Sequence, residues 1–219
     1  MRKMTESPIL QIARHEIRQV LREPKFLVPF LFPPLLLCLS EFLFLSGVDD
    51  PYVVRQLMLF CALLISPMGV PLASDSFAGE RERGSLELLL LLPVKPAEIF
   101  FGKLLAVIPI PFVFILFGES AYALAFGNAS FDVWWMSVVA GFAFSVFISG
   151  FSLLVSLYVN TARAANQSAL VSVFVLLIVS EKFSGYYFAY PYAPLVLIAA
   201  VALFFVAASL IALKRFRQM

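Results

Sequence analysis

Six long apolar runs dominate the sequence, and each is close to the length that a helix needs to cross a lipid bilayer. A membrane-spanning helix takes about 20 consecutive, mostly apolar residues. The chain has 219 residues, of which 62% are hydrophobic and 14% charged, whereas soluble domains average about 45–50% apolar and about 25% charged residues. A soluble protein of this length cannot bury so much apolar surface. We therefore predict an all-α integral membrane protein that forms one domain over residues 1–219.

The predicted spans differ in how clearly they stand out. The fifth is the weakest because it is short and contains Asn166, Gln167 and two serines. The segment after it, Glu181–Pro194, is partly apolar and carries glycine and proline, so a small re-entrant element on the outer side is an alternative there. The six predicted spans are Phe26–Gly47, Val53–Ser74, Gly102–Phe126, Val133–Tyr158, Ala164–Ser180 and Ala193–Leu213.

Lysine and arginine are distributed unevenly around these spans. Of the 16 such residues, only Arg55 and Lys182 fall on one predicted side of the membrane. Because cytoplasmic loops carry the excess of positive charge, we predict a multi-pass protein of the cytoplasmic (inner) membrane with both termini in the cytoplasm. That arrangement requires an even number of spans, which supports six. The net charge of only +2 gives no reason to expect a nucleic-acid partner.

The first 25 residues precede the six-helix bundle predicted over residues 26–213, and they have an amphipathic pattern. Apolar residues recur at helical spacing, while the arginines occupy other faces. Such a helix lies in the membrane interface, and Pro24 would turn the chain into the first span. The simpler alternative is a basic flank beside the membrane. The apolar positions are Ile9, Ile12, Ala13, Ile17, Val20 and Leu21.

The connection between the second and third predicted spans, Gly79–Lys103, begins with a charged run. Glu80, Arg81, Glu82 and Arg83 alternate in sign, so this run must lie in water or at a polar interface. We expect Gly84 to end the helix before it and Ser85 to cap the helix after it.

A short apolar helix is predicted next in the chain. Leu86 and the run Leu88–Leu92 make it apolar almost all round, and Pro93 bounds it. The helix is too short to span a bilayer, so it should lie roughly parallel to the membrane and pack against something apolar. Two interpretations stay open on physical grounds: a hairpin packed on its own bundle, or a coupling helix inserted into a groove on a partner ATPase.

This stretch resembles the signature segment of ABC-2-type permeases. That family shows an acidic and basic run, then Gly-Ser/Thr-Leu-Glu, a leucine-rich stretch, Leu-Pro-Val, and Glu-Ile before a Gly-Lys that opens the third span. The chain has Glu80–Glu87, Leu92-Pro93-Val94, Glu98-Ile99 and Gly102-Lys103 at those places. In length and plan it is also similar to the haem-exporter membrane subunit of cytochrome c maturation, a relative of the same class.

The resemblance implies a permease subunit that forms half of the pathway of an ATP-driven exporter. Its partners would be ABC ATPase subunits, which bind ATP and Mg²⁺, and a second permease half, identical or paralogous. The chain itself would hold no cofactor, and Asn160–Asn166 would make a smaller contact with the ATPase. By the same resemblance, the ATPase-docking residues are Glu80, Arg81, Glu82, Arg83, Gly84, Ser85, Leu86, Glu87, Leu88, Leu89 and Pro93.

Catalytic residues are not expected in this chain. Gly79-x4-Gly84-Ser85 superficially matches a phosphate-binding loop, but the lysine that reaches the phosphates is missing. The single histidine, His15, and the two cysteines, Cys38 and Cys61, form no pattern of metal ligands. A membrane-embedded enzyme would need clustered His, Asp or Glu near one membrane face, which the sequence does not offer.

Carboxylates inside the predicted spans are the remaining candidates for function. Glu41 is expected near the outer headgroups, whereas Glu119 lies deeper and is a possible pathway-lining residue. The alternative is that Glu119 pairs within the bundle. A secondary transporter driven by an ion gradient is the alternative function, and it would need charged residues near the midplane of several spans.

Pro67, Pro71, Pro109 and Pro111 predict kinks in the second and third spans.

Overall fold

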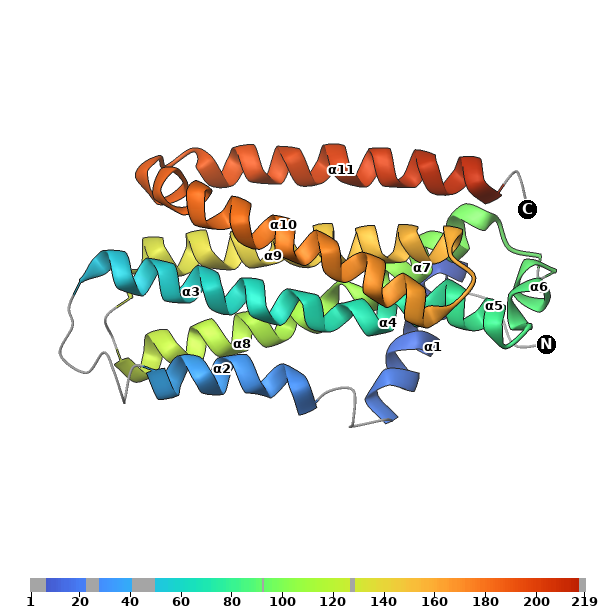
Figure 1. The fold of residues 1–219 in the computed structure, drawn as a ribbon, viewed down its shortest axis with the longest axis horizontal. Helices are drawn as coiled ribbons and strands as arrows, with labels where there is room; N and C mark the ends of the chain where they lie inside the picture. Colours follow the sequence, from blue (N-terminus) through green and yellow to red (C-terminus); the bar gives the residue numbers. More distant parts are fainter. Residues whose placement is uncertain (1–6, 23–27, 41–49, 92, 127–128, 217–219) are drawn as a thin grey trace.

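The computed structural model describes residues 7–22, 28–40, 50–91, 93–126 and 129–216, and these residues build an all-helical bundle (Figure 1). Two short segments depart from the α-helical type: η3 is a 3₁₀ helix and η4 is a π-helix. In chain order the helices are α1 (Pro8–Arg22), α2 (Val28–Ser40), α3 (Pro51–Ile65), η3 (Ser66–Gly69), α4 (Val70–Ser74), η4 (Asp75–Gly79), α5 (Glu80–Glu82), α6 (Ser85–Leu90), α7 (Pro96–Val107), α8 (Pro109–Phe126), α9 (Phe131–Tyr158), α10 (Ala162–Ala189) and α11 (Ala193–Phe216).

Within the described residues, five helical stretches are long and apolar enough to cross a membrane. They correspond to the second to sixth predicted spans. The first predicted span, Phe26–Gly47, is described only as the 13-residue α2, and Glu41 lies outside the described residues. The first span, and with it the count of six spans, therefore stays a prediction. The five stretches are Tyr52–Glu82, Pro96–Ala125, Phe131–Tyr158, Ala162–Ser180 and Ala193–Phe216.

The second span follows one continuous helical path whose type changes along its length. The α-helix gives way to a 3₁₀ turn around Pro67 and later to the π-helix of η4. Proline removes a backbone donor and disturbs the α-helical hydrogen-bond ladder, which explains the first change. In the third span, the boundary between α7 and α8 falls directly before Pro109. The prolines predicted to kink these spans thus lie at changes or breaks in the helices.

The third span begins earlier than predicted. We expected it to open at Gly102, but α7 starts at Pro96. The Lys95 backbone N–H donates to Glu98 Oε2 at 3.0 Å, and proline suits the first helical position because that residue needs no intrahelical donor. As a result, Lys103 lies inside a helix, not at its start.

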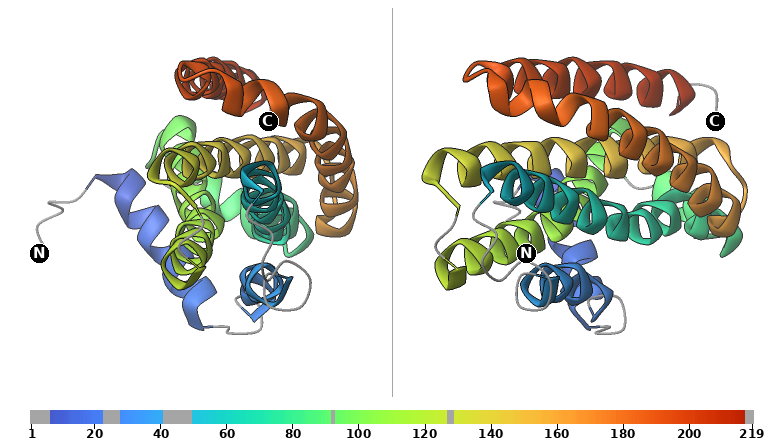
Figure 2. Two further views of the ribbon diagram at one scale, coloured as in Figure 1. Left: turned by 90° about the vertical axis from the view of Figure 1, so that its left-hand side faces the viewer. Right: turned by 60° about the vertical axis from the view of Figure 1, so that its left-hand side comes forward.

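The central helix of the bundle is α9, which packs against α3, α4, α8, α10 and α11. Of its most apolar window, 72% is buried, against 11% for α10 and 17% for α11. Small residues let neighbouring helices approach closely: a Cβ at Gly141 would lie 2.6 Å from Ile115 Cγ2. Figure 2 shows α11 on one side of α9 and α2 on the other. The large exposed apolar side chains of α2, α10 and α11 suit contact with lipid or with another chain.

The helix that carries the fifth span continues beyond it. The span ends at Ser180, as predicted, whereas α10 extends to Ala189, so residues 181–189 prolong this helix and do not form a separate element. Gly185 does not break the helix, because a single glycine only weakens a helix that neighbouring turns support. The Thr161 hydroxyl accepts from the Ala164 N–H at 3.2 Å and caps the start of α10.

The helix predicted within residues 1–25 is present as α1, with Ala13 buried and Arg18 and Arg22 exposed. It crosses the end of the bundle that also holds α5, α6 and the C-terminal end of α11 (Figure 1). It packs against α7. Its place in the membrane interface stays a prediction.

Candidate functional site

The Gly79–Lys103 segment, which contains α5, α6 and the start of α7, lies at this same end of the bundle (Figure 1). Gly84 separates α5 from α6 with a φ of +68°, a left-handed conformation that glycine adopts without steric cost. It ends the preceding helix as predicted. The predicted N-cap at Ser85 is wrong: Ser85 is the first residue of α6, and its hydroxyl donates to the Glu80 carbonyl at 3.2 Å. Carbonyls at a helix end need a donor, and here the hydroxyl supplies one.

The leucines of the short helix divide between two surroundings. Leu86 is 6% exposed and belongs to a core cluster that includes Phe77, Phe100 and Leu104. Leu88 is 68% exposed and Leu91, directly after the helix, is 80% exposed. The side chain of Leu89 and all of Leu92 lie outside the described residues, while Glu82, Glu87 and Pro93 are exposed. One leucine thus fixes α6 to its own bundle, and two others remain open to a partner.

Lys103 is the buried charge that ties this end of the bundle together. Its side chain is 1% exposed, and its Nζ lies 2.8 Å from Glu80 Oε1 and 2.8 Å from Glu16 Oε1. It also donates to the Ser76 carbonyl at 3.1 Å and lies 5.2 Å from the centre of the Phe77 ring. A buried ammonium is tolerated only when paired and hydrogen-bonded. Through this one group, α7 is joined to α1 and to α5.

Arg81 holds the loop between α9 and α10. Its guanidinium donates to the carbonyls of Val159 at 2.6 Å and Leu157 at 3.0 Å. A cation at a helix C-terminus is favourable because the last carbonyls are unpaired and the helix dipole is negative there. The Gly79–Lys103 segment is therefore joined to the end of α9, directly before Asn160–Asn166, the second connection predicted to meet the ATPase.

Arg83 pairs with Asp75 of η4. The Nη1–Oδ1 distance is 3.1 Å, and two further contacts are 3.3 Å. These hydrogen bonds raise the pKa of Arg83 above its usual value. Gly79 makes the pair possible, because a Cβ there would collide with the Asp75 carboxylate.

A close contact between α1 and α7 lies one residue before Lys103. A Cβ at Gly102 would be 2.8 Å from Ile12 Cγ2 and 3.1 Å from the Ile9 carbonyl oxygen. Only glycine permits this approach. Helix α1 thus fits against α7 by shape as well as by the pair between Glu16 and Lys103.

Glu119 lies far from this site, in the core of the bundle. It is 0% exposed, its Oε1 accepts from the Ser137 hydroxyl at 2.8 Å, and its Oε2 has no hydrogen-bond partner among the described residues. The structure thus brings together the residues of the 79–103 segment but not Glu119.

Three contacts of this site were not predicted from the sequence. They are the pairing of Lys103 with two carboxylates, the hydrogen bonds from Arg81 to the end of α9, and the packing of α1 against Gly102. One signal for the first was available. A lysine inside an apolar helix needs carboxylate partners, and Glu16 is the only acidic residue on α1.

Two comparisons with known proteins bear on this arrangement. Residues 10–204 match the family model described as ABC-2 family transporter protein. The chain is also 30% identical over 125 residues to the "Probable multidrug ABC transporter permease YbhR" of Escherichia coli strain K12 and to the protein of the same description from Escherichia coli O157:H7.

The alignment with these relatives covers 56% of this chain but only 33% of their length. The chain thus matches about a third of the length of each relative. Neither relative supports the closer similarity to the haem-exporter membrane subunit that the sequence suggested.

Proposed function

The chain belongs to the ABC-2 family of transporter proteins, and on that premise we propose that it docks a separate ATPase through the exposed face of α6. It is a multi-pass membrane protein and the permease component of an ABC-2-type transporter. A permease of this kind has no ATPase activity, and ABC permeases pair with ATPase subunits. Family membership favours ATP-driven transport over the alternative of an ion-gradient-driven secondary transporter.

The observation that carries the docking proposal is the division of leucines on and beside α6. Leu86 is buried in the bundle, so any partner meets Leu88 and Leu91, which are 68% and 80% exposed. Exposed leucines at the polar end of a membrane protein leave apolar surface in water unless a partner covers it. Glu82 and Glu87 are exposed beside them and would supply a polar rim.

The remaining charged residues of the segment position α6. Glu80 binds Lys103, Arg81 binds the end of α9, and Arg83 binds Asp75. A docking helix can transmit a movement of the ATPase to the membrane spans only if it is fixed to those spans. These contacts would carry force from α6 to α7, to η4 and to the end of α9, which directly precedes Asn160–Asn166, the segment proposed as the smaller ATPase contact.

Orientation and assembly follow from the same premise. We place both termini in the cytoplasm, since α1, α6 and the basic end of α11, with Lys214 and Arg215, lie at one end of the bundle. A second permease half, identical or paralogous, would complete the pathway by covering part of the exposed apolar face of α2, α10 or α11.

The class of transported compound is proposed from the relatives. The name of the matched relatives mentions multidrug transport, and we propose export of a hydrophobic or amphipathic compound. For Glu119 to line the pathway, the helices around it would have to separate and expose it, because the carboxylate is fully buried and bonded to Ser137 of α9 in this conformation.

Purification of the tagged full-length chain from its native membranes in mild detergent tests the proposal. We expect an ATPase with a phosphate-binding loop to copurify, and we expect Mg²⁺-dependent ATP hydrolysis from the complex. A chain that retains no ATPase, and that moves amphipathic dyes in vesicles supplied only with an ion gradient, would overturn it.

A further inference from the structure

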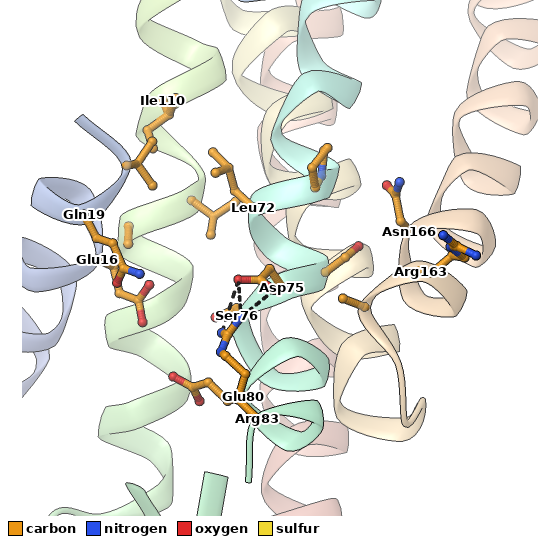
Figure 3. Close-up of a pocket in the computed structure, with 16 residues that line it drawn as sticks. Glu16, Gln19, Leu72, Asp75, Ser76, Glu80, Arg83, Ile110, Arg163 and Asn166 are labelled. Atoms are coloured by element: carbon orange, nitrogen blue, oxygen red, sulfur yellow. Dashed lines mark hydrogen bonds and ion pairs between the residues drawn. The ribbon is translucent and has the colours of Figure 1, made fainter. Parts of the chain in front are cut away.

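A cavity of about 600 Å³ opens beside the Lys103 cluster, between α1, the junction of α4 and η4, α7–α8 and α10. Exposed residues in its wall, including Pro71, Asp75 and Arg163, show that it reaches the surface. Figure 3 shows Glu16 and Gln19 on one wall and Arg163 and Asn166 on the opposite wall, with the pair of Asp75 and Arg83 between them.

The lining changes character along the bundle. Glu80 and Arg83 occupy the end near α5, Leu72 lies level with Gln19 and Asn166, and Ile110 lies furthest along, toward the middle of the bundle (Figure 3). Val107 and Ala106 extend the apolar part. A cavity that is polar at one end and apolar at the other fits a molecule with a headgroup and a hydrocarbon tail.

One buried group in the wall points to a ligand. Ser76 is 7% exposed and lines the cavity, yet its hydroxyl has no hydrogen-bond partner among the described residues. Glu80, in the same wall, has one carboxylate oxygen buried without a partner. Buried polar atoms in native proteins are normally paired, so a hydrogen-bonding headgroup in the cavity would complete this wall.

The charges around the cavity define the headgroup. Its carboxylates are Glu16, Asp75 and Glu80, and its cations are Arg83 and Arg163 together with Lys103 directly behind the wall. Three carboxylates thus face three cations. A ligand with a net charge would leave one of these charges without a partner, whereas a headgroup that carries both signs can pair on both walls.

We propose that this cavity binds a zwitterionic amphiphile, with its cationic group toward Glu16 and Glu80, its phosphate or other anion toward Arg163, and its tail along Leu72 and Ile110. Arg163 is exposed and makes no ion pair among the described residues, so it is free to take the anion. The site lies within one chain and does not depend on ATPase docking.

Photolabelling of the full-length chain tests the proposal directly. The chain is reconstituted in phosphatidylglycerol vesicles that contain a trace of phosphatidylcholine with a photoactivatable group on one acyl chain near the glycerol. We expect label in peptides that contain residues 16–20 and 106–110. Added phosphatidylcholine should remove it, whereas the cationic amphiphile dodecyltrimethylammonium should not.

Two variants and their controls make the test specific to the cavity. Arg163→Glu should lower the labelling about tenfold, as expected for the loss of one charge-assisted hydrogen bond, and Lys182→Glu on the same helix should not. Ile110→Trp should block the apolar end, whereas Val113→Trp, exposed on the same helix, should not. Folding is checked by far-UV circular dichroism.

The labelling experiments have outcomes that contradict the proposal and outcomes that support it. Equal competition by dodecyltrimethylammonium, or labelling that is unchanged in both Arg163→Glu and Ile110→Trp, would overturn the proposal. Labelling that persists during ATP turnover with the partner ATPase would identify a resident bilayer lipid, and labelling that falls would identify a transported molecule. Either result supports a zwitterionic amphiphile in this cavity.

Discussion

The Nζ of Lys103 lies 2.8 Å from Glu80 Oε1, inside the bundle, with 1% of the lysine side chain and 19% of the glutamate side chain exposed. This pair joins the third span to the start of the segment that carries α6. Glu16 shares the same ammonium at 2.8 Å, so helix α1 is part of the same connection. A displacement of α6 would therefore be transmitted to α7 and to α1 together.

Replacement of Lys103 by methionine should destabilise the protein. The change keeps much of the side-chain volume but leaves two largely buried carboxylates without their cation. Removal of one partner from a buried ion pair costs about 3–5 kcal/mol, and the partial exposure of Glu16, at 27%, favours the lower end, about 3 kcal/mol. The free energy of unfolding, measured by denaturation in detergent micelles, checks this.

Lys95→Met is the matched control, because Lys95 is exposed and lies in the same Gly79–Lys103 segment. It should leave the free energy of unfolding within about 0.5 kcal/mol of the wild type. Equal stabilities of the two variants would show that the carboxylates around Lys103 need no cation.

A methyl group at Gly102 should loosen α1 from α7. Its Cβ would be 2.8 Å from Ile12 Cγ2 and 3.1 Å from the Ile9 carbonyl oxygen, and overpacking of this kind costs about 1–3 kcal/mol. Amide hydrogen exchange across residues 8–22 should accelerate in Gly102→Ala. Gly185→Ala, where nothing lies within 4 Å of the added Cβ, should leave the exchange of α1 unchanged, and equal exchange in both variants would contradict the contact.

Sequence patterns predicted the apolar spans well because a bilayer imposes a length and a composition on each one. They were poorer at the ends. The third span opens at Pro96 instead of Gly102, since charged and polar residues can extend a helix beyond the hydrocarbon layer. The fifth span seemed weak because of its polar residues near 166, yet it forms part of a 28-residue helix.

The candidate site was harder to predict than the spans. The resemblance to ABC-2-type permeases predicts one role for the charged residues 80–83, which is contact with an ATPase. In the structure, Glu80, Arg81 and Arg83 bind Lys103, Val159 and Asp75. These partners lie 8 to 78 residues away in sequence, and only the packing of the helices brings the distant ones within reach. Leu88 is exposed and Leu86 is buried because of the way in which α6 packs against the bundle, which the sequence alone does not determine.

Loss of the Ser137 hydroxyl should destabilise the core near Glu119. Its Oγ donates to Glu119 Oε1 at 2.8 Å, and both residues are 0% exposed. Ser137→Ala would leave the carboxyl group without this donor, at a cost of about 1–3 kcal/mol. Thermal unfolding in detergent should show a lower midpoint than for the wild type.

Ser145→Ala on the same helix is the control for that measurement. The Ser145 hydroxyl is buried too, but it donates only to the Gly141 carbonyl of its own helix, at 2.9 Å. Its removal should therefore have a smaller effect on the midpoint. If the Ser137 and Ser145 variants unfold at the same temperature, the bond from Ser137 to Glu119 contributes nothing to stability.

The central claim is that α6 is fixed to its own bundle on one side and offers its other side to an ATPase. Affinity for the copurifying ATPase, measured by surface binding with the purified full-length chain, tests it most directly. Leu88→Asp should weaken that affinity about tenfold or more with an unchanged unfolding midpoint, whereas Leu195→Asp, equally exposed at 68% on α11, should leave it unchanged. Leu86→Ala should instead lower the stability of the chain by about 2–5 kcal/mol. An unchanged ATPase affinity in Leu88→Asp and in the double variant with Leu91→Asp would contradict the claim.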